Sequence, residues 1–142
     1  MELCRDLQRG ESSSAELMSE TYRRINSVNP QVNALVNVID EELAIQEANK
    51  CDAVPIADRG PLHGLPMAIK DLIAVKGLPT TMVFVPFDDN IASEDDPLVS
   101  RLRSAGAVII GHTNTPEFGL GSHTFNQLFG KTLHPYDLTK TP

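Results

Sequence analysis

Apolar side chains near the N-terminus recur with the period of a helix that buries one face. After Ser13, apolar residues stand three or four positions apart: Ala15, Met18, Tyr22 and Ile25. Ser13 and Glu16 have the spacing of a capping box, in which side chains satisfy the free N–H groups at a helix start. The pattern predicts an amphipathic helix that begins after Ser13. We expect it to end near Val28, because Pro30 disfavours helical geometry in the residue before it.

A short strand and a second helix are predicted between residues 32 and 51. Four apolar residues stand at every second position and alternate with Asn33 and Asn37: Val32, Ala34, Val36 and Val38. A period of two indicates a strand with one apolar face. Asp40 then stands where a helix cap belongs, and Lys50 in the last turn complements the helix dipole. The apolar side of this helix consists of Ala44, Ala48 and Cys51.

The second half of the chain alternates between predicted strands and helices. A connection with several prolines and glycines, residues 52–66, leads into a strand at Leu65–Lys70. The pair Asp96–Pro97 predicts a helix start, and Gly106 predicts its stop just before an apolar strand at 107–110. The expected buried face of that helix is Leu98, Val99, Leu102 and Ala105. Such a succession is typical of an α/β fold, in which helices cover a sheet.

The C-terminal part has little periodic pattern. Thr115 followed by Pro116 predicts another helix start, but Gly119 and Gly121 keep that helix short. Residues 122–142 show few regular apolar positions. A long irregular segment of this kind usually lines a site or packs against further chain.

Composition and charge restrict the classes of function. With 41% hydrophobic and 22% charged residues, the 142-residue chain has the makeup of one globular domain. Its 12 basic and 19 acidic residues give a net charge of -7, and no run of Lys or Arg could follow a phosphate backbone, so we expect no direct nucleic-acid partner. We find no apolar segment of signal-peptide or membrane-span type, and we expect a cytoplasmic protein without a membrane partner.

Cysteine and histidine spacing gives no sign of a disulfide framework or a metal site. Cys4 and Cys51 follow no pattern and are interpreted as reduced thiols. The histidines are too far apart along the chain for one helical face or for a zinc-type spacing: His63, His112, His123 and His134. We therefore expect no metal.

The segment 60–71, with the sequence GPLHGLPMAIKD, resembles the GPLxGxPxxxKD segment of the amidase-signature family. The resemblance continues in register through GLPTT, EDD, RLRSAGA, GHTNTPEF and NQLFGKTLHPY, which begin at positions 77, 94, 101, 111 and 126. It covers residues 60–142 and implies an α/β fold with a mixed sheet covered by helices. On this basis, residues 1–59 form an N-terminal helical region and residues 60–142 the start of an incomplete α/β core.

Lys70 matches the lysine of the Ser/cis-Ser/Lys triad that the resemblance implies. Without this context, a lysine at the end of an apolar strand is most often a side chain whose ammonium reaches water. A lysine that acts as a base must be neutral, which costs roughly 4 to 5 kcal/mol against the ammonium form and requires burial. We expect the apolar neighbours Leu65, Ala68 and Ile69 to supply a dry setting. Asp71 should point to the opposite face and support the site structurally rather than neutralise the lysine.

The resemblance also implies that the bridging cis-serine lies in a glycine-serine-rich segment directly after the position of Pro142. It implies that the nucleophilic serine lies further along the chain. The sequence is therefore interpreted as an N-terminal fragment of a chain several times longer, inactive by itself. The family needs no cofactor or metal. The resemblance implies small aliphatic or aryl amides as the default substrates. It leaves the substrate-binding residues unknown and leaves a homodimer open as the assembly.

Three positions depart from the family pattern. His112 stands where the family usually has lysine, His134 where it usually has asparagine, and Val83–Phe84 where a Gly–Ser pair is common. A bulky Phe84 near the active-site loop would alter the shape of the pocket, so the choice of amide stays open. For His112 we favour an innocent surface change, because single surface substitutions are usually neutral.

The leading hypothesis is hydrolysis of carboxylic amides to an acid and ammonia or an amine. The same motifs fit the amidase component of a tRNA-dependent amidotransferase, which works with a tRNA-binding partner. A third interpretation, from a different class, is a non-catalytic remnant that serves as an interaction module.

Overall fold

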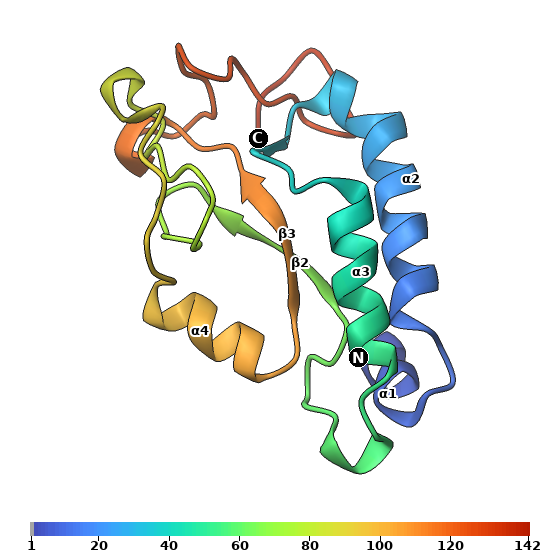
Figure 1. Cartoon of the computed structure of the whole chain (residues 1–142). Helices are drawn as coiled ribbons and strands as arrows, with labels where there is room; N and C mark the ends of the chain where they lie inside the picture. The colour runs from blue at the N-terminus through green and yellow to red at the C-terminus, as the bar shows by residue number, and fades with distance from the viewer. Residues whose placement is uncertain (1) are drawn as a thin grey trace.

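The computed structural model describes residues 2–142 and contains helices on both sides of a small sheet (Figure 1). The α-helices are α1 (Glu2–Arg9), α2 (Ser14–Val32), α3 (Glu41–Asp52) and α4 (Pro97–Ser104). The strands are β1 (Leu35–Val36), β2 (Pro66–Lys70) and β3 (Val108–Thr113). Three short 3-10 helices complete the order: η1 (Ile56–Asp58), η2 (Val85–Phe87) and η3 (Glu117–Gly119).

The sheet has the order β1-β3-β2. Its central strand, β3, runs antiparallel to β1 and parallel to β2, so the sheet is mixed. Helices α2 and α3 lie side by side on one face, and α4 lies on the other (Figure 1). This arrangement confirms the predicted α/β class with a mixed sheet covered by helices.

Helix α2 begins as the sequence predicts but ends later. Ser13 caps it by accepting a hydrogen bond from the backbone N–H of Glu16, and the helix then runs through Pro30 to Val32. The predicted end near Val28 is wrong. Asn33 adopts a left-handed φ of 53° and donates its N–H to the Asn29 carbonyl at 2.7 Å. This cap closes the last turn, so the hydrogen bond that Pro30 cannot make does not stop the helix.

The strand predicted from alternating residues is much shorter than its pattern. Only Leu35 and Val36 pair with β3, whereas Val32 belongs to α2. Asn37 takes a left-handed φ of 48°, which turns the chain away from the sheet, and Val38 beyond it is 37% exposed. Period-two spacing alone therefore overestimates the length of the strand.

Other predicted caps and strands are confirmed, with strand bounds that differ by up to three residues. Asp40 accepts from the N–H groups of Glu42 and Leu43 at the start of α3, and Asp96 accepts from Leu98 at the start of α4. On α4, Val99 is fully buried as predicted, but Leu98 is 46% exposed and does not face the core. An eight-residue helix has a narrow contact face, and Leu98 lies outside it.

The short helix predicted after Thr115 forms as η3, but it starts one residue later than predicted and Thr115 is not its cap. The backbone N–H of Thr115 donates to the side chain of Asn114, and the short η3 begins only after Pro116. Phe118 lies inside η3 with a left-handed φ of 51°, so this single turn cannot extend into a regular α-helix.

Residues 120–142 contain no helix or strand, as predicted, and they pack against the end of α2. Asn33 donates its side-chain N–H to the Phe129 carbonyl at 2.7 Å, and Thr132 donates its hydroxyl to the Asn33 carbonyl at 2.7 Å. The irregular segment is thus fastened to a residue almost one hundred positions earlier.

The core consists of two apolar clusters, one on each face of the sheet. The cluster on the α2–α3 face contains Met18, Tyr22, Ala44, Ala48, Val108 and Ile110. The cluster on the α4 face contains Ile69, Val75, Val99 and Ile109. Since the first cluster joins residues before and after position 60, the two predicted regions share a core. Their division at residues 59 and 60 stays a prediction.

Candidate functional site

Lys70 is the last residue of β2, and the chain turns sharply behind it. Its carbonyl accepts hydrogen bonds from the N–H groups of Leu72 at 2.7 Å and Ile73 at 3.0 Å. In the strand, Ile69 faces the α4 cluster and Ala68 the opposite cluster, so Lys70 follows the alternation on the side of Ala68.

The side chain of Lys70 is exposed. The expected dry setting is therefore wrong for residues 2–142: Ile69 is buried, but it faces away from the lysine, and Leu65 and Ala68 are only partly buried. Its catalytic role stays a prediction.

Asp71 follows directly and lies in the opposite environment. Its side chain is 0% exposed. One carboxylate oxygen accepts from the backbone N–H of Thr81 at 2.9 Å, and the other accepts from the Thr81 hydroxyl. The Thr81 hydroxyl in turn accepts from the N–H of Val83 at 2.9 Å. Asp71 thus fastens the loop around residues 79–84 to the end of β2.

His112 is also buried on the side of Asp71, which contradicts the expected surface position. It pairs in register with Ile69, and a register shift between Met67 and Ala68 brings it to this face. Its side chain is 0% exposed, and its Nδ1 lies 3.5 Å from a carboxylate oxygen of Asp71. Burial lowers the pKa of His112, although the negative charge of Asp71 acts to raise it.

Sequence reasoning missed the link between these three residues. Thr81 lies within the GLPTT segment and was given no role, and His112 was not recognised as a buried residue. The signal for His112 was its place at the end of an apolar run, residues 107–111, that forms the central strand. The register shift that decides which face it occupies has no marker in the sequence.

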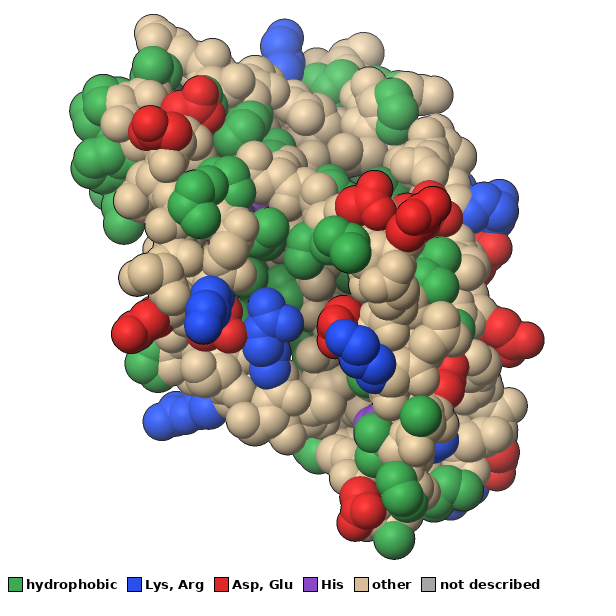
Figure 2. Space-filling model, in the orientation of Figure 1, with side chains coloured by type: hydrophobic (Ala, Val, Ile, Leu, Met, Phe, Trp, Pro, Cys, Tyr) green, Lys and Arg blue, Asp and Glu red, His purple; other side chains and the backbone are tan. Residues whose placement is uncertain are grey.

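The departure at Val83–Phe84 produces a group of aromatic rings. Val83 is 1% exposed, whereas the rings of Phe84, Phe87 and Phe118 contact one another. Their centroids lie 5.3 Å apart for Phe84–Phe87, 5.1 Å for Phe84–Phe118 and 6.5 Å for Phe87–Phe118. We call these three rings the aromatic cluster. Figure 2 shows hydrophobic side chains gathered at the upper left, where Figure 1 places η2 and η3.

The third departure, His134, belongs to a local turn of the C-terminal segment. Its Nδ1 accepts from the N–H of Tyr136 at 3.3 Å, and it forms an isolated bridge with Asp137. Cys4 and Cys51 are free thiols. Within residues 2–142, no three His, Cys, Asp or Glu side chains lie close enough to hold a metal ion, and no helix could cross a membrane.

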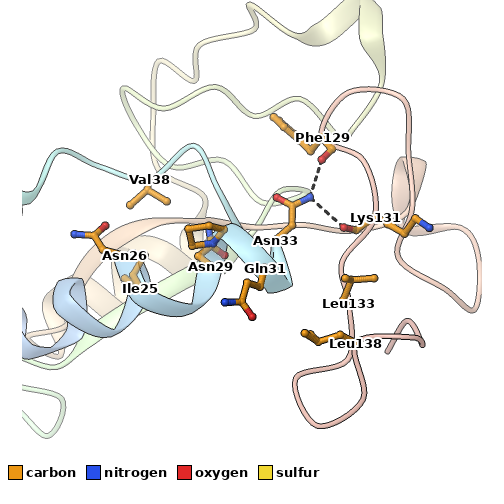
Figure 3. Close-up of a pocket in the computed structure, with 11 residues that line it drawn as sticks. Ile25, Asn26, Asn29, Gln31, Asn33, Val38, Phe129, Lys131, Leu133 and Leu138 are labelled. Carbon is orange, nitrogen blue, oxygen red and sulfur yellow. Dashed lines mark hydrogen bonds between the residues drawn. The ribbon is translucent and has the colours of Figure 1, made fainter.

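A cavity of about 740 Å³, whose lining does not include Lys70, lies between the end of α2 and the C-terminal segment (Figure 3). Asn33 reaches across it to the carbonyls of Phe129 and Lys131. Its lining contains one charged side chain, Lys131, and no Ser, Cys or His. The cavity offers no hydroxyl or thiol nucleophile of the kind that amide hydrolysis needs, so we do not assign it to the chemistry.

Comparison with known proteins identifies the family. The sequence model of the amidase family matches residues 16–142. The chain belongs to the amidase family. This amidase-family chain is 42% identical over 127 residues to an acylamidase of Rhodococcus erythropolis, a match that covers 89% of the chain and 27% of that protein. It is 38% identical over 143 residues to the A component of the glutamyl-tRNA(Gln) amidotransferase of Prochlorococcus marinus, covering 99% of the chain and 29% of the relative.

Solved structures agree with the family. The native peptide amidase of Stenotrophomonas maltophilia has a TM-score of 0.84 and 30% identity, over 96% of this chain and 30% of that one. The 6-aminohexanoate cyclic dimer hydrolase has a TM-score of 0.84 and 30% identity, over 98% and 28%. The chain thus spans less than a third of the length of these amidase-family proteins, as expected for an N-terminal fragment.

Proposed function

We propose that the full-length protein hydrolyses a carboxylic amide to an acid and ammonia or an amine, with Lys70 as the terminal base of a Ser/cis-Ser/Lys triad. The observation that carries this is the position of Lys70. It ends β2 within the GPLHGLPMAIKD segment, its backbone is fixed by a tight turn, and its side chain is free to be covered by further chain.

In this mechanism, neutral Lys70 takes a proton from the bridging serine, which takes one from the nucleophilic serine. The nucleophile forms a bond to the amide carbonyl carbon, backbone N–H groups hold the oxyanion, and the C–N bond breaks as the nitrogen receives a proton. Water then attacks the acyl-enzyme and releases the acid. In the family pattern both serines follow position 142, so residues 1–142 alone should be inactive.

The contribution of this chain is to hold Lys70 in place. Asp71 and its hydrogen bonds to Thr81 fix the backbone directly after the lysine. Keeping a lysine neutral near pH 7 costs roughly 4 to 5 kcal/mol against the ammonium form, and burial must supply this energy. The exposed Lys70 must therefore be enclosed in the full-length protein.

The test measures ammonia release from simple amides by the full-length protein, by Lys70→Ala and by Lys76→Ala. Lys76 is also exposed and lies in the following loop, so it is a matched control for loss of a lysine. We expect Lys70→Ala to lose about 10² to 10⁴-fold in kcat/KM, as for removal of a general base, and Lys76→Ala to stay near wild type. Retention of activity by Lys70→Ala would disprove the assigned role.

A second candidate is the catalytic component of a tRNA-dependent amidotransferase. Seven of the similar proteins, at 38% to 42% identity, are A components of glutamyl-tRNA(Gln) amidotransferases. This candidate predicts copurification with a tRNA-binding partner and activity on misacylated tRNA. Activity on simple amides by the isolated full-length chain favours the first candidate, and absence of both activities leaves the interaction module.

A further inference from the structure

The aromatic cluster is held in a costly backbone conformation. Met82, Val83 and Phe118 have left-handed φ values of 50°, 55° and 51°. For a β-branched residue such as Val83 this conformation is a genuine outlier, and strained backbone of this kind is found mostly at functional sites. A hydrogen bond from the Phe118 N–H to the Met82 carbonyl, at 2.8 Å, ties the two loops that carry the rings.

Both loops are fastened to the two residues that follow Lys70. Asp71 holds the first loop through Thr81, as described above. Leu72 holds the second: a Cβ added to Gly119 would lie 2.6 Å from its Cδ1, so the backbone after Phe118 packs closely on the Leu72 side chain. The aromatic cluster is therefore built onto the same turn that positions Lys70, and Figure 1 shows both loops at that end of β2.

The cluster combines apolar exposure with a negative rim. Phe87 is 39% and Phe118 is 41% exposed, and Val85 beside them is 51% exposed. The adjoining Asp88 and Glu117 are exposed carboxylates. Such a surface favours an uncharged aromatic group and disfavours a carboxylate, because rings pair edge to face with rings while like charges repel.

We infer that the aromatic cluster forms one wall of the substrate site and selects amides that carry an uncharged aromatic group. This inference rests on the proposed amide hydrolysis and specifies its substrate class. Phe84 and Phe87 act as specificity-determining residues, which contact the substrate away from the scissile bond.

The experiment compares full-length wild type, Phe84→Ala, Phe87→Ala and the control Leu98→Ala, which truncates an exposed apolar residue on α4. The probes are 3-phenylpropionamide, N-benzylacetamide, butyramide and succinamate. We expect wild type to prefer an aromatic amide over butyramide and to reject succinamate. Each Phe variant should lose about 10 to 100-fold in kcat/KM for that aromatic amide, mainly through KM, and should change little for butyramide. The control should follow wild type.

Wild-type hydrolysis of butyramide without an aromatic preference, or equal losses on all substrates in the Phe variants, overturns the inference and leaves the proposed function intact. That result would mean that further chain covers the aromatic cluster. If wild type hydrolyses none of the amides, the proposed function fails, and calorimetric binding of 3-phenylpropionamide decides the inference. Binding that weakens in Phe87→Ala supports it, and no binding overturns it.

Discussion

Thr80 and Thr81 are adjacent buried threonines with opposite hydrogen-bond status. The Thr81 hydroxyl donates to the Asp71 carboxylate and accepts from the Val83 N–H at 2.9 Å. The Thr80 hydroxyl is buried with no hydrogen-bond partner in the part of the chain that is described, and the residue is 3% exposed. Replacement by the isosteric valine therefore removes a hydroxyl group at either position, but it breaks hydrogen bonds only at Thr81.

The expected magnitudes follow from these contacts. Thr81→Val removes a hydrogen bond to a charged group, about 1.5 to 3 kcal/mol, and leaves the buried N–H of Val83 unpaired, about 1 to 3 kcal/mol. Asp71 keeps its bond from the Thr81 N–H, so we expect a total near 3 kcal/mol. Thr80→Val removes an unsatisfied buried hydroxyl and should be neutral or slightly stabilising.

Urea unfolding of the full-length variants measures this difference. Hydrogen exchange of the peptide that spans residues 79–84 gives a second, local readout. Near 3 kcal/mol, opening of the loop should become roughly a hundredfold more frequent in Thr81→Val, because 1.4 kcal/mol is a factor of ten. Equal stability of the two variants would show that the bonds of Thr81 to Asp71 do not hold the loop.

Three further predictions concern stability. Burial lowers the pKa of His112 in the folded protein, so its contribution to stability is complete above about pH 6.5 and is lost as the pH falls. Between pH 7 and pH 5, His112→Gln should therefore lose less stability than wild type in thermal unfolding. Equal losses would contradict this. Asp52→Asn should cost about 1 to 2 kcal/mol in urea, since Asp52 accepts from two N–H groups of the first turn of α2, at 2.7 and 3.0 Å; an unchanged midpoint would count against this. Gly64→Ala should abolish soluble expression, because its Cβ would lie 1.7 Å from Ser14 Oγ, whereas Gly77→Ala, also at a left-handed φ but in open space, should cost about 1 kcal/mol; similar yields would refute the clash.

Local signals in the sequence located most elements of the fold. Side-chain caps at Ser13, Asp40 and Asp96 act within three residues, so they are visible in the sequence and are confirmed. The stop at Gly106 is also local, because its left-handed φ of 97° favours glycine.

The errors occurred where distant residues decide the local conformation. The end of α2 depends on a cap at Asn33 whose side chain binds residues near position 130. The buried state of His112 depends on a register shift against β2, and the exposure of Lys70 depends on which residues cover the end of that strand. Propensity and periodicity describe neighbours along the chain, so these contacts lie beyond their reach.

Because β3 is the central strand, the sheet can form during synthesis only after β3 has been translated. β1 and β2 are not neighbours in the sheet, and each finds its partner only in β3, which is translated last of the three. About 70 residues separate β1 from β3. At synthesis rates of about 5 to 20 residues per second, roughly 4 to 14 seconds pass between the synthesis of β1 and that of β3, the strand that covers the apolar faces of α2 and α3. Nascent chains of this protein should therefore depend on chaperones until residue 113 has left the exit tunnel.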